Sequence, residues 1–146
     1  MGLSNTQAAF EAAAEAAFRS ALSGLGPTIY TSEKDTQNIA TNRVEIVANV
    51  IQLGPHQRVI SGSWEYDQAQ MRVDVSYVDE PGSSTAPSAA GNAGALRNRI
   101  TTAAIQSGLT AHTVGSIDLV ATTREVDDER NEIALRHSYA LMLFVT

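Results

Sequence analysis

The side chains best suited to chemistry in this chain are its three histidines, His56, His112 and His137. They stand far apart in the sequence, and no two have the spacing of a helical metal site. His137 lies on the apolar side of the last predicted strand, where a lone histidine is typical of a hydrogen-bonded core residue. His56 follows Pro55 in a predicted turn, and His112 stands in a polar connection. We therefore predict neither a catalytic nor a metal-binding role for these residues.

A second candidate is the acidic run Asp127, Asp128 and Glu129, which separates two predicted strands. It lacks the alternating ligands and the glycine of a calcium loop, and a charged hairpin tip explains it without an ion. The chain has no cysteine, which excludes disulfides, thiolate zinc sites and cysteine nucleophiles. It also has neither a phosphate loop nor a Gly-x-Ser-x-Gly elbow. We expect no catalytic residue, no cofactor and no metal.

Length and charge limit the remaining classes of function. A chain of 146 residues is expected to form one domain, residues 1–146, with a core of its own. No apolar run is long enough to cross a membrane, and the first residues lack the pattern of a signal peptide. The formal charge of −6 and the single lysine argue against a surface that binds nucleic acid through its phosphates. They are compatible with a surface along which DNA slides.

Helical spacing predicts two helices. The first extends from Ser4 to Ser23, with Ser4 and Gln7 as a capping box. Its apolar stripe consists of Phe10, Ala14, Ala17, Phe18, Ala21, Leu22 and Leu25. The second extends from residue 95 to 107 and ends at Gly108. Before it, residues 79–94 have no periodicity and are rich in Pro, Gly and Ser, which predicts a long loop.

Period-2 alternation predicts the strands. Residues 43–53 are apolar on both sides, which is typical of a central strand or one covered twice. A short strand is predicted at residues 59–60 and a long extended stretch at residues 64–78. Residues 114–124 and 132–145 form a closing pair of strands, joined by the acidic run.

The second face of the last strand is more apolar than a solvated surface. This face carries Ala134, Ala140, Met142 and Phe144. We expect these side chains to meet either the helices or an adjoining subunit. The order of elements predicts the α+β class, an antiparallel or mixed β-sheet packed by two α-helices on one face.

Five segments in this order carry a resemblance to a known family. They are the first helix through Phe18 and Leu22, the short extended piece at residues 28–30, the strand Met71-Arg72-Val73-Asp74-Val75 with its long loop, the helix Leu96-Arg97-Asn98-Arg99-Ile100, and the closing pair that ends Leu141-Met142-Leu143-Phe144-Val145. The arrangement resembles the tail-terminator and tail-completion (head–tail joining) proteins of long-tailed bacteriophages.

The resemblance implies a structural role. Such proteins form a ring, commonly of six copies, that caps the tail tube and joins it to the head connector. It implies four partners: further copies of the chain in a hexameric ring, a tail tube protein, a head–tail connector protein, and DNA that passes without specific binding, with no membrane contact. The expected location is the virion tail or neck, after assembly in the host cytoplasm. Ala134, Ala140, Met142 and Phe144 would then meet the next subunit, and Asp127, Asp128 and Glu129 would line the lumen.

Two alternatives remain open at this stage. One is a different virion part, either a head–tail connector or a tail tube subunit. The other is a monomeric small-ligand-binding or enzymatic α+β domain, whose first pocket candidate is the neighbourhood of His56, Trp64 and Tyr66.

Overall fold

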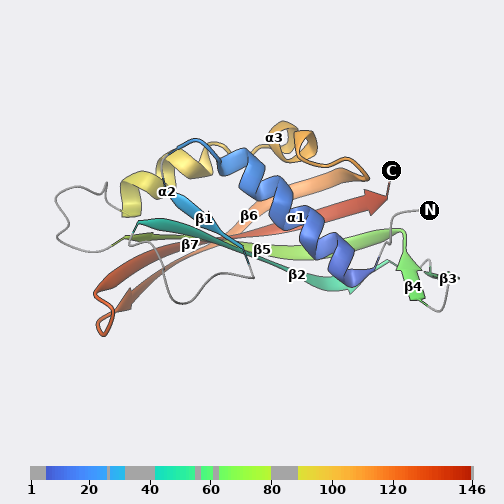
Figure 1. Ribbon diagram of the computed structural model, residues 1–146, viewed down its shortest axis with the longest axis horizontal. Coiled ribbons are helices and arrows are strands. Elements are labelled where there is room, and N and C mark those ends of the chain that lie inside the picture. The colour runs from blue at the N-terminus through green and yellow to red at the C-terminus, as the bar shows by residue number, and fades with distance from the viewer. Residues whose placement is uncertain are drawn as a thin grey trace.

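The computed structural model describes residues 6–25, 27–31, 42–54, 57–60, 63–79 and 89–145. These residues form a five-stranded sheet, a separate two-stranded sheet and three helices. All three helices lie over the same face of the larger sheet (Figure 1). The fold is therefore α+β, as predicted, but with three helices instead of two.

The larger sheet is mixed and has the strand order β1-β2-β5-β7-β6. Its strands are β1 (Thr28–Tyr30), β2 (Arg43–Leu53), β5 (Gln68–Asp79), β6 (His112–Asp127) and β7 (Glu132–Val145). Only β1 and β2 run parallel, and the other three pairs are antiparallel. The predicted bounds of β2 and β7 agree with the structure.

A small hairpin interrupts the extended stretch predicted at residues 64–78. Strand β3 (Gln57–Ile60) pairs with β4 (Ser63–Tyr66) in a sheet of its own, and β5 starts again at Gln68. The prediction of one continuous strand was therefore wrong. The apolar positions change phase there, from Trp64 and Tyr66 to Ala69 and Met71, and the backbone partner changes from β3 to β2 and β7.

Helix α1 (Gln7–Leu22) packs against β2 and β5 through the predicted stripe. Its buried apolar residues are Phe10, Ala14, Ala17, Phe18 and Leu22. The cap is Thr6 and not Ser4, which lies outside the described residues: the Thr6 Oγ1 accepts a hydrogen bond of 3.3 Å from the Ala9 amide. A threonine hydroxyl in this position satisfies one of the unpaired amides of the first turn, so the helix begins later than predicted.

The second predicted helix is two short ones, α2 (Ala89–Arg97) and α3 (Thr102–Ser107). The break occurs because the Thr101 hydroxyl accepts a hydrogen bond of 3.1 Å from the Ala104 amide and starts a new helix. The predicted loop is also too long, since residues 89–94 are helical. The rest of that loop, residues 80–88, lies outside the described part of the chain.

The core lies between the helices and one face of the sheet. The sheet side chains in it alternate along each strand and include Val44, Ile46, Met71, Val73, Val75, Tyr77, Tyr139, Leu141 and Leu143. No described helix covers the opposite face. Of the two predicted alternatives for β2, the structure shows the first: the strand lies between β1 and β5, but it is not covered on both faces, and Val47 and Ile51 are exposed.

The predicted closing hairpin is confirmed as the pair β6–β7. In Figure 1 its turn, coloured orange, lies beyond the other strands and bends away from the helices. Residues without a cross-strand partner occur at Gly115 and Val120, so β6 carries two bulges. Within the described residues, no helix is long and apolar enough to cross a membrane.

Candidate assembly surface

The sheet face opposite the helices, here called the open face, carries the predicted interface residues. Because Tyr139, Leu141 and Leu143 point into the core, the alternate residues of β7 point to the open face. These are Ala134, Ala140, Met142 and Phe144, of which the first three are half-buried and Phe144 is exposed. The structure therefore places all four on one face of one strand, with no helix over them in the described chain.

Phe144 also packs within its own chain. A Cβ at Gly115 in β6 would lie 2.3 Å from the Cε2 atom of Phe144. The bulged glycine thus leaves room for the phenyl ring to lie across the neighbouring strand. The ring is held in place while one side of it stays open to solvent.

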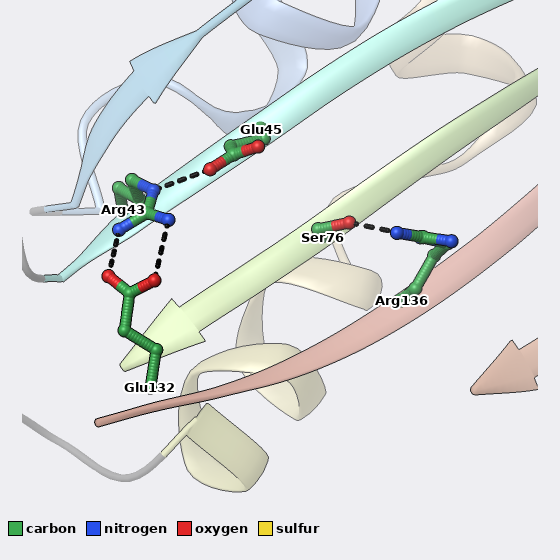
Figure 2. A network of polar contacts seen from close by, with 5 residues as sticks. All are labelled: Arg43, Glu45, Ser76, Glu132 and Arg136. Carbon is green, nitrogen blue, oxygen red and sulfur yellow. Dashed lines mark hydrogen bonds and ion pairs between the residues drawn. The ribbon is translucent and has the colours of Figure 1, made fainter. Parts of the chain in front are cut away.

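An arginine network lies at the other end of the open face (Figure 2). The Arg43 guanidinium donates to both Glu132 carboxylate oxygens at 2.5 and 3.1 Å, and its Nε donates to Glu45 at 2.5 Å. Arg43 is only 4% exposed. Burial opposes its charge, but hydrogen bonds to Glu132 and Glu45 outweigh burial and raise the pKa of Arg43.

A second arginine continues the polar surface along the hairpin. The Arg136 Nε donates to the Ser76 Oγ at 3.3 Å (Figure 2), and its Nη1 pairs with Glu125 at 3.1 Å. Both networks border an open concavity of about 800 Å³. Six acidic and three basic side chains line this concavity, which makes its surface negative.

The acidic run lies at the hairpin tip, as predicted. Strand β6 ends at Asp127, and Asp128 and Glu129 are in the turn, all three exposed. The Asp127 carboxylate accepts hydrogen bonds from the amides of Glu129 (3.1 Å) and Arg130 (3.2 Å), so it shapes the turn. Among the described residues, no group of three His, Asp or Glu side chains is arranged to hold a metal ion.

The two described histidines are both buried. The prediction that His112 stands in a polar connection was wrong, because His112 begins β6. Its ring centroid lies 5.0 Å from that of Phe10. Phe10 belongs to the buried core, so the His112 ring packs against that core. Burial lowers the pKa of His112.

His137 belongs to a buried polar cluster beneath the helices. Its ring lies 5.1 Å from that of Tyr77 and 6.5 Å from that of Tyr139. Within the described chain, its Nδ1 has no hydrogen-bond partner, so the prediction of a hydrogen-bonded histidine was wrong for Nδ1. Burial and then the charge of Arg97 lower the pKa of His137, and burial raises the pKa of Tyr77.

The alternative pocket is not assembled by the described residues. His56 and the Trp64 side chain lie outside them, and Tyr66 is half-buried. The structure does reveal one arrangement that sequence reasoning missed. Glu15 and Glu11 of α1 accept hydrogen bonds from the backbone amides of Ala48 (3.0 Å) and Val50 (2.9 Å) in β2. The only sequence signal was the spacing of the two glutamates by one helical turn.

Comparison of the chain with protein-family models and with curated proteins found no match.

Proposed function

We propose that this protein is a structural virion protein resembling a phage tail terminator. In this proposal it forms a homo-oligomeric ring, expected to have six copies, that caps the tail tube and joins it to the head connector. The observation that carries the proposal is the open face, where an apolar strip on β7 leads to a protruding acidic hairpin. A monomer with an enclosed ligand site has no need of such a strip.

The order of elements supports the proposal. An amphipathic first helix, a mixed sheet and a closing C-terminal hairpin follow one another as the resemblance requires. A ring needs two different patches on each subunit, because its contacts are head-to-tail. The apolar strip with Met142 and Phe144 supplies one candidate patch.

The charge of the hairpin supports the expected passage of DNA. Asp127, Asp128 and Glu129 are exposed at the tip, and the adjacent concavity is negative. Facing a lumen, such a surface repels phosphates and lets DNA pass without holding it. On this account, the ring contacts DNA without specific binding.

The test combines light scattering after size exclusion with negative-stain images of the same fraction. A terminator is expected to give single rings, in solution or on the ends of tail tubes. Open-ended tubes formed by the protein itself would point instead to a tail tube subunit. A strict monomer that binds neither tail tubes nor head connectors would contradict the proposal.

A double variant tests the apolar strip. Met142→Asp with Phe144→Asp is expected to abolish the ring and leave a folded monomer, because two carboxylates cannot be buried against a neighbour. Ala103→Asp with Ser107→Asp, at two exposed positions on α3, is the matched control and should keep the ring. Circular dichroism checks the fold: if the double variant unfolds, the strip belongs to the core of the single chain.

A further inference from the structure

The large apolar side chains that the structure leaves exposed gather on two strands. Six are exposed in the described chain, by 38% to 61%, and five of them lie on β2 or β6. These five are Val47 and Ile51 on β2, and Leu119, Val120 and Val126 on β6. The two strands lie at opposite sides of the five-stranded sheet, where β6 is one edge and only the short β1 lies outside β2.

The outer edge of β2 is open beyond β1. Strand β1 pairs with residues 43–45 alone, which leaves residues 46–53 without a strand on that side among the described residues. Two amides of this stretch are held by the carboxylates of Glu15 and Glu11 instead. A groove of about 620 Å³ follows the stretch, lined by α1 residues including Ala12 and Ala16. The small alanine side chains leave space beside the edge.

The outer edge of β6 is also open. No described strand pairs with it on that side, and its residues from 118 to 127 are all exposed. An open edge that carries exposed apolar side chains is a template for pairing with another strand. The bulge at Val120 separates the rest of the strand from residues 121–127, which form one regular stretch. At about 3.3 Å per residue, seven residues span roughly 23 Å, close to the length of the open stretch of β2.

We propose that residues 121–127 of β6 in one copy pair with residues 46–53 of β2 in the next copy. The inference rests on the proposed function, since it adds an edge-to-edge contact between neighbouring subunits of the ring to the contact that the apolar strip makes. Pairing of two identical edges would give a closed dimer. Pairing of two different edges gives a head-to-tail contact that repeats from copy to copy and can close into a ring.

The direction of the strands agrees with this joint. Strands β2, β5, β7 and β6 are antiparallel in succession, so β6 runs opposite to β2. When the sheet continues from one copy to the next without a flip, the new pair is therefore antiparallel. The helices of all copies then stay on one face of a continuous sheet, and the open faces form the other.

Charge favours the same partner. Arg124 is exposed on β6, and it lies on the helix side because its cross-strand partner Leu135 packs against the core. Glu11 and Glu15 border the β2 edge on the helix side as well. In the proposed pair, the backbone carbonyls of the neighbouring copy accept hydrogen bonds from the β2 amides in place of the two carboxylates. Glu11 and Glu15 can then form ion pairs with Arg124 of the neighbouring copy.

Disulfide trapping tests the joint, and the chain has no cysteine of its own to interfere. Asn49→Cys is combined with Ala121→Cys or Thr123→Cys, because these three side chains lie on the open face. Under mild oxidation, at least one pair is expected to give a ladder of covalent oligomers in a denaturing gel. Asn49→Cys combined with Ser107→Cys, an exposed position on α3, is the control and should give no ladder.

Mixing single variants tests the head-to-tail geometry. Each single variant alone should remain uncrosslinked, and a mixture of Asn49→Cys protein with Thr123→Cys protein should give covalent dimers. Rings in light scattering without a ladder, or crosslinks within a single-variant sample, would overturn this joint while the ring proposal stands. A protein that stays monomeric and uncrosslinked, also when tail tubes and head connectors are present, would contradict both.

Discussion

The Arg43 guanidinium on β2 and the Glu132 carboxylate on β7 form a two-point ion pair that passes over β5. The two residues are 89 positions apart in the sequence, and neither strand pairs with the other. The contact therefore ties the start of the hairpin to the far side of the sheet. It positions the acidic end of the open face relative to the helix-bearing part of the fold.

Removing the carboxylate should destabilise the fold. Glu132→Ala is expected to lower the free energy of unfolding by about 1.5–3 kcal/mol, because it leaves a buried guanidinium with fewer acceptors. Glu125→Ala is the matched control. The side chains of Arg136 and Glu125 are 40% and 49% exposed, so their ion pair should contribute less than about 1 kcal/mol. Urea unfolding measures both, and equal losses would show that the buried pair has no special weight.

The glutamates on the β2 edge should act as hydrogen-bond acceptors. Glu11→Ala is expected to cost about 1–2 kcal/mol and to speed hydrogen exchange at the Val50 amide, which loses its acceptor. Glu11→Gln keeps an oxygen at the end of a side chain of the same length, so it should restore most of the protection. If the glutamine variant loses as much stability and as much protection of the Val50 amide as the alanine variant, then Glu11 contributes through its charge and not through hydrogen bonding.

Stability should fall on acidification because two histidines are buried. The pKa values of His112 and His137 are lowered in the folded chain, whereas an unfolded histidine titrates near about 6.5. Below that pH the unfolded state binds more protons than the native state, so protons favour unfolding. The contribution is fully present above about pH 6.5 and is lost as the pH falls toward the folded pKa values.

Urea unfolding at pH 7.5 and 5.5 measures this effect. The loss of stability between the two pH values is expected to be smaller in His137→Asn than in the unmodified chain, since one buried proton acceptor is gone. An equal loss in both proteins would mean that His137 does not contribute to the acid sensitivity.

Two glycines should respond oppositely to alanine. A Cβ at Gly108 would lie 2.9 Å from the backbone Cα of Ala17, so Gly108→Ala forces α3 away from α1 and should cost about 1–3 kcal/mol. A Cβ at Gly94, inside α2, meets nothing within 4 Å. Gly94→Ala should therefore leave stability unchanged or raise it by up to about 1 kcal/mol. Thermal unfolding compares the two, and a destabilised Gly94→Ala with an unaffected Gly108→Ala would contradict the packing.

The strands could be predicted where alternation was unbroken. The bounds of β2 and β7 follow from long period-2 patterns, and the α1 stripe follows from helical spacing. The break between α2 and α3 could not be predicted this way, because it depends on one hydroxyl, that of Thr101, competing for a helix amide. The same kind of local competition places the α1 cap at Thr6.

The candidate surface was predictable only in part. The apolar second face of β7 and the acidic tip are visible in the sequence, because both depend on residues close together in the chain. The Arg43–Glu132 pair and the Glu15 contact to Ala48 depend on the strand order and on where α1 lies over the sheet. Apolar residues on both sides of β2 suggested burial, but Val47 and Ile51 are exposed because no described element covers that side.

The central claim is that copies of this chain assemble through the apolar strip on the open face. Light scattering after size exclusion, performed in parallel on the unmodified protein and on the Met142→Asp, Phe144→Asp variant, tests it most directly. The account predicts a ring-sized mass for the unmodified protein, alone or on the ends of tail tubes, and a folded monomer for the variant. The same mass for both proteins, or an unmodified protein that stays monomeric beside tail tubes and connectors, would contradict it.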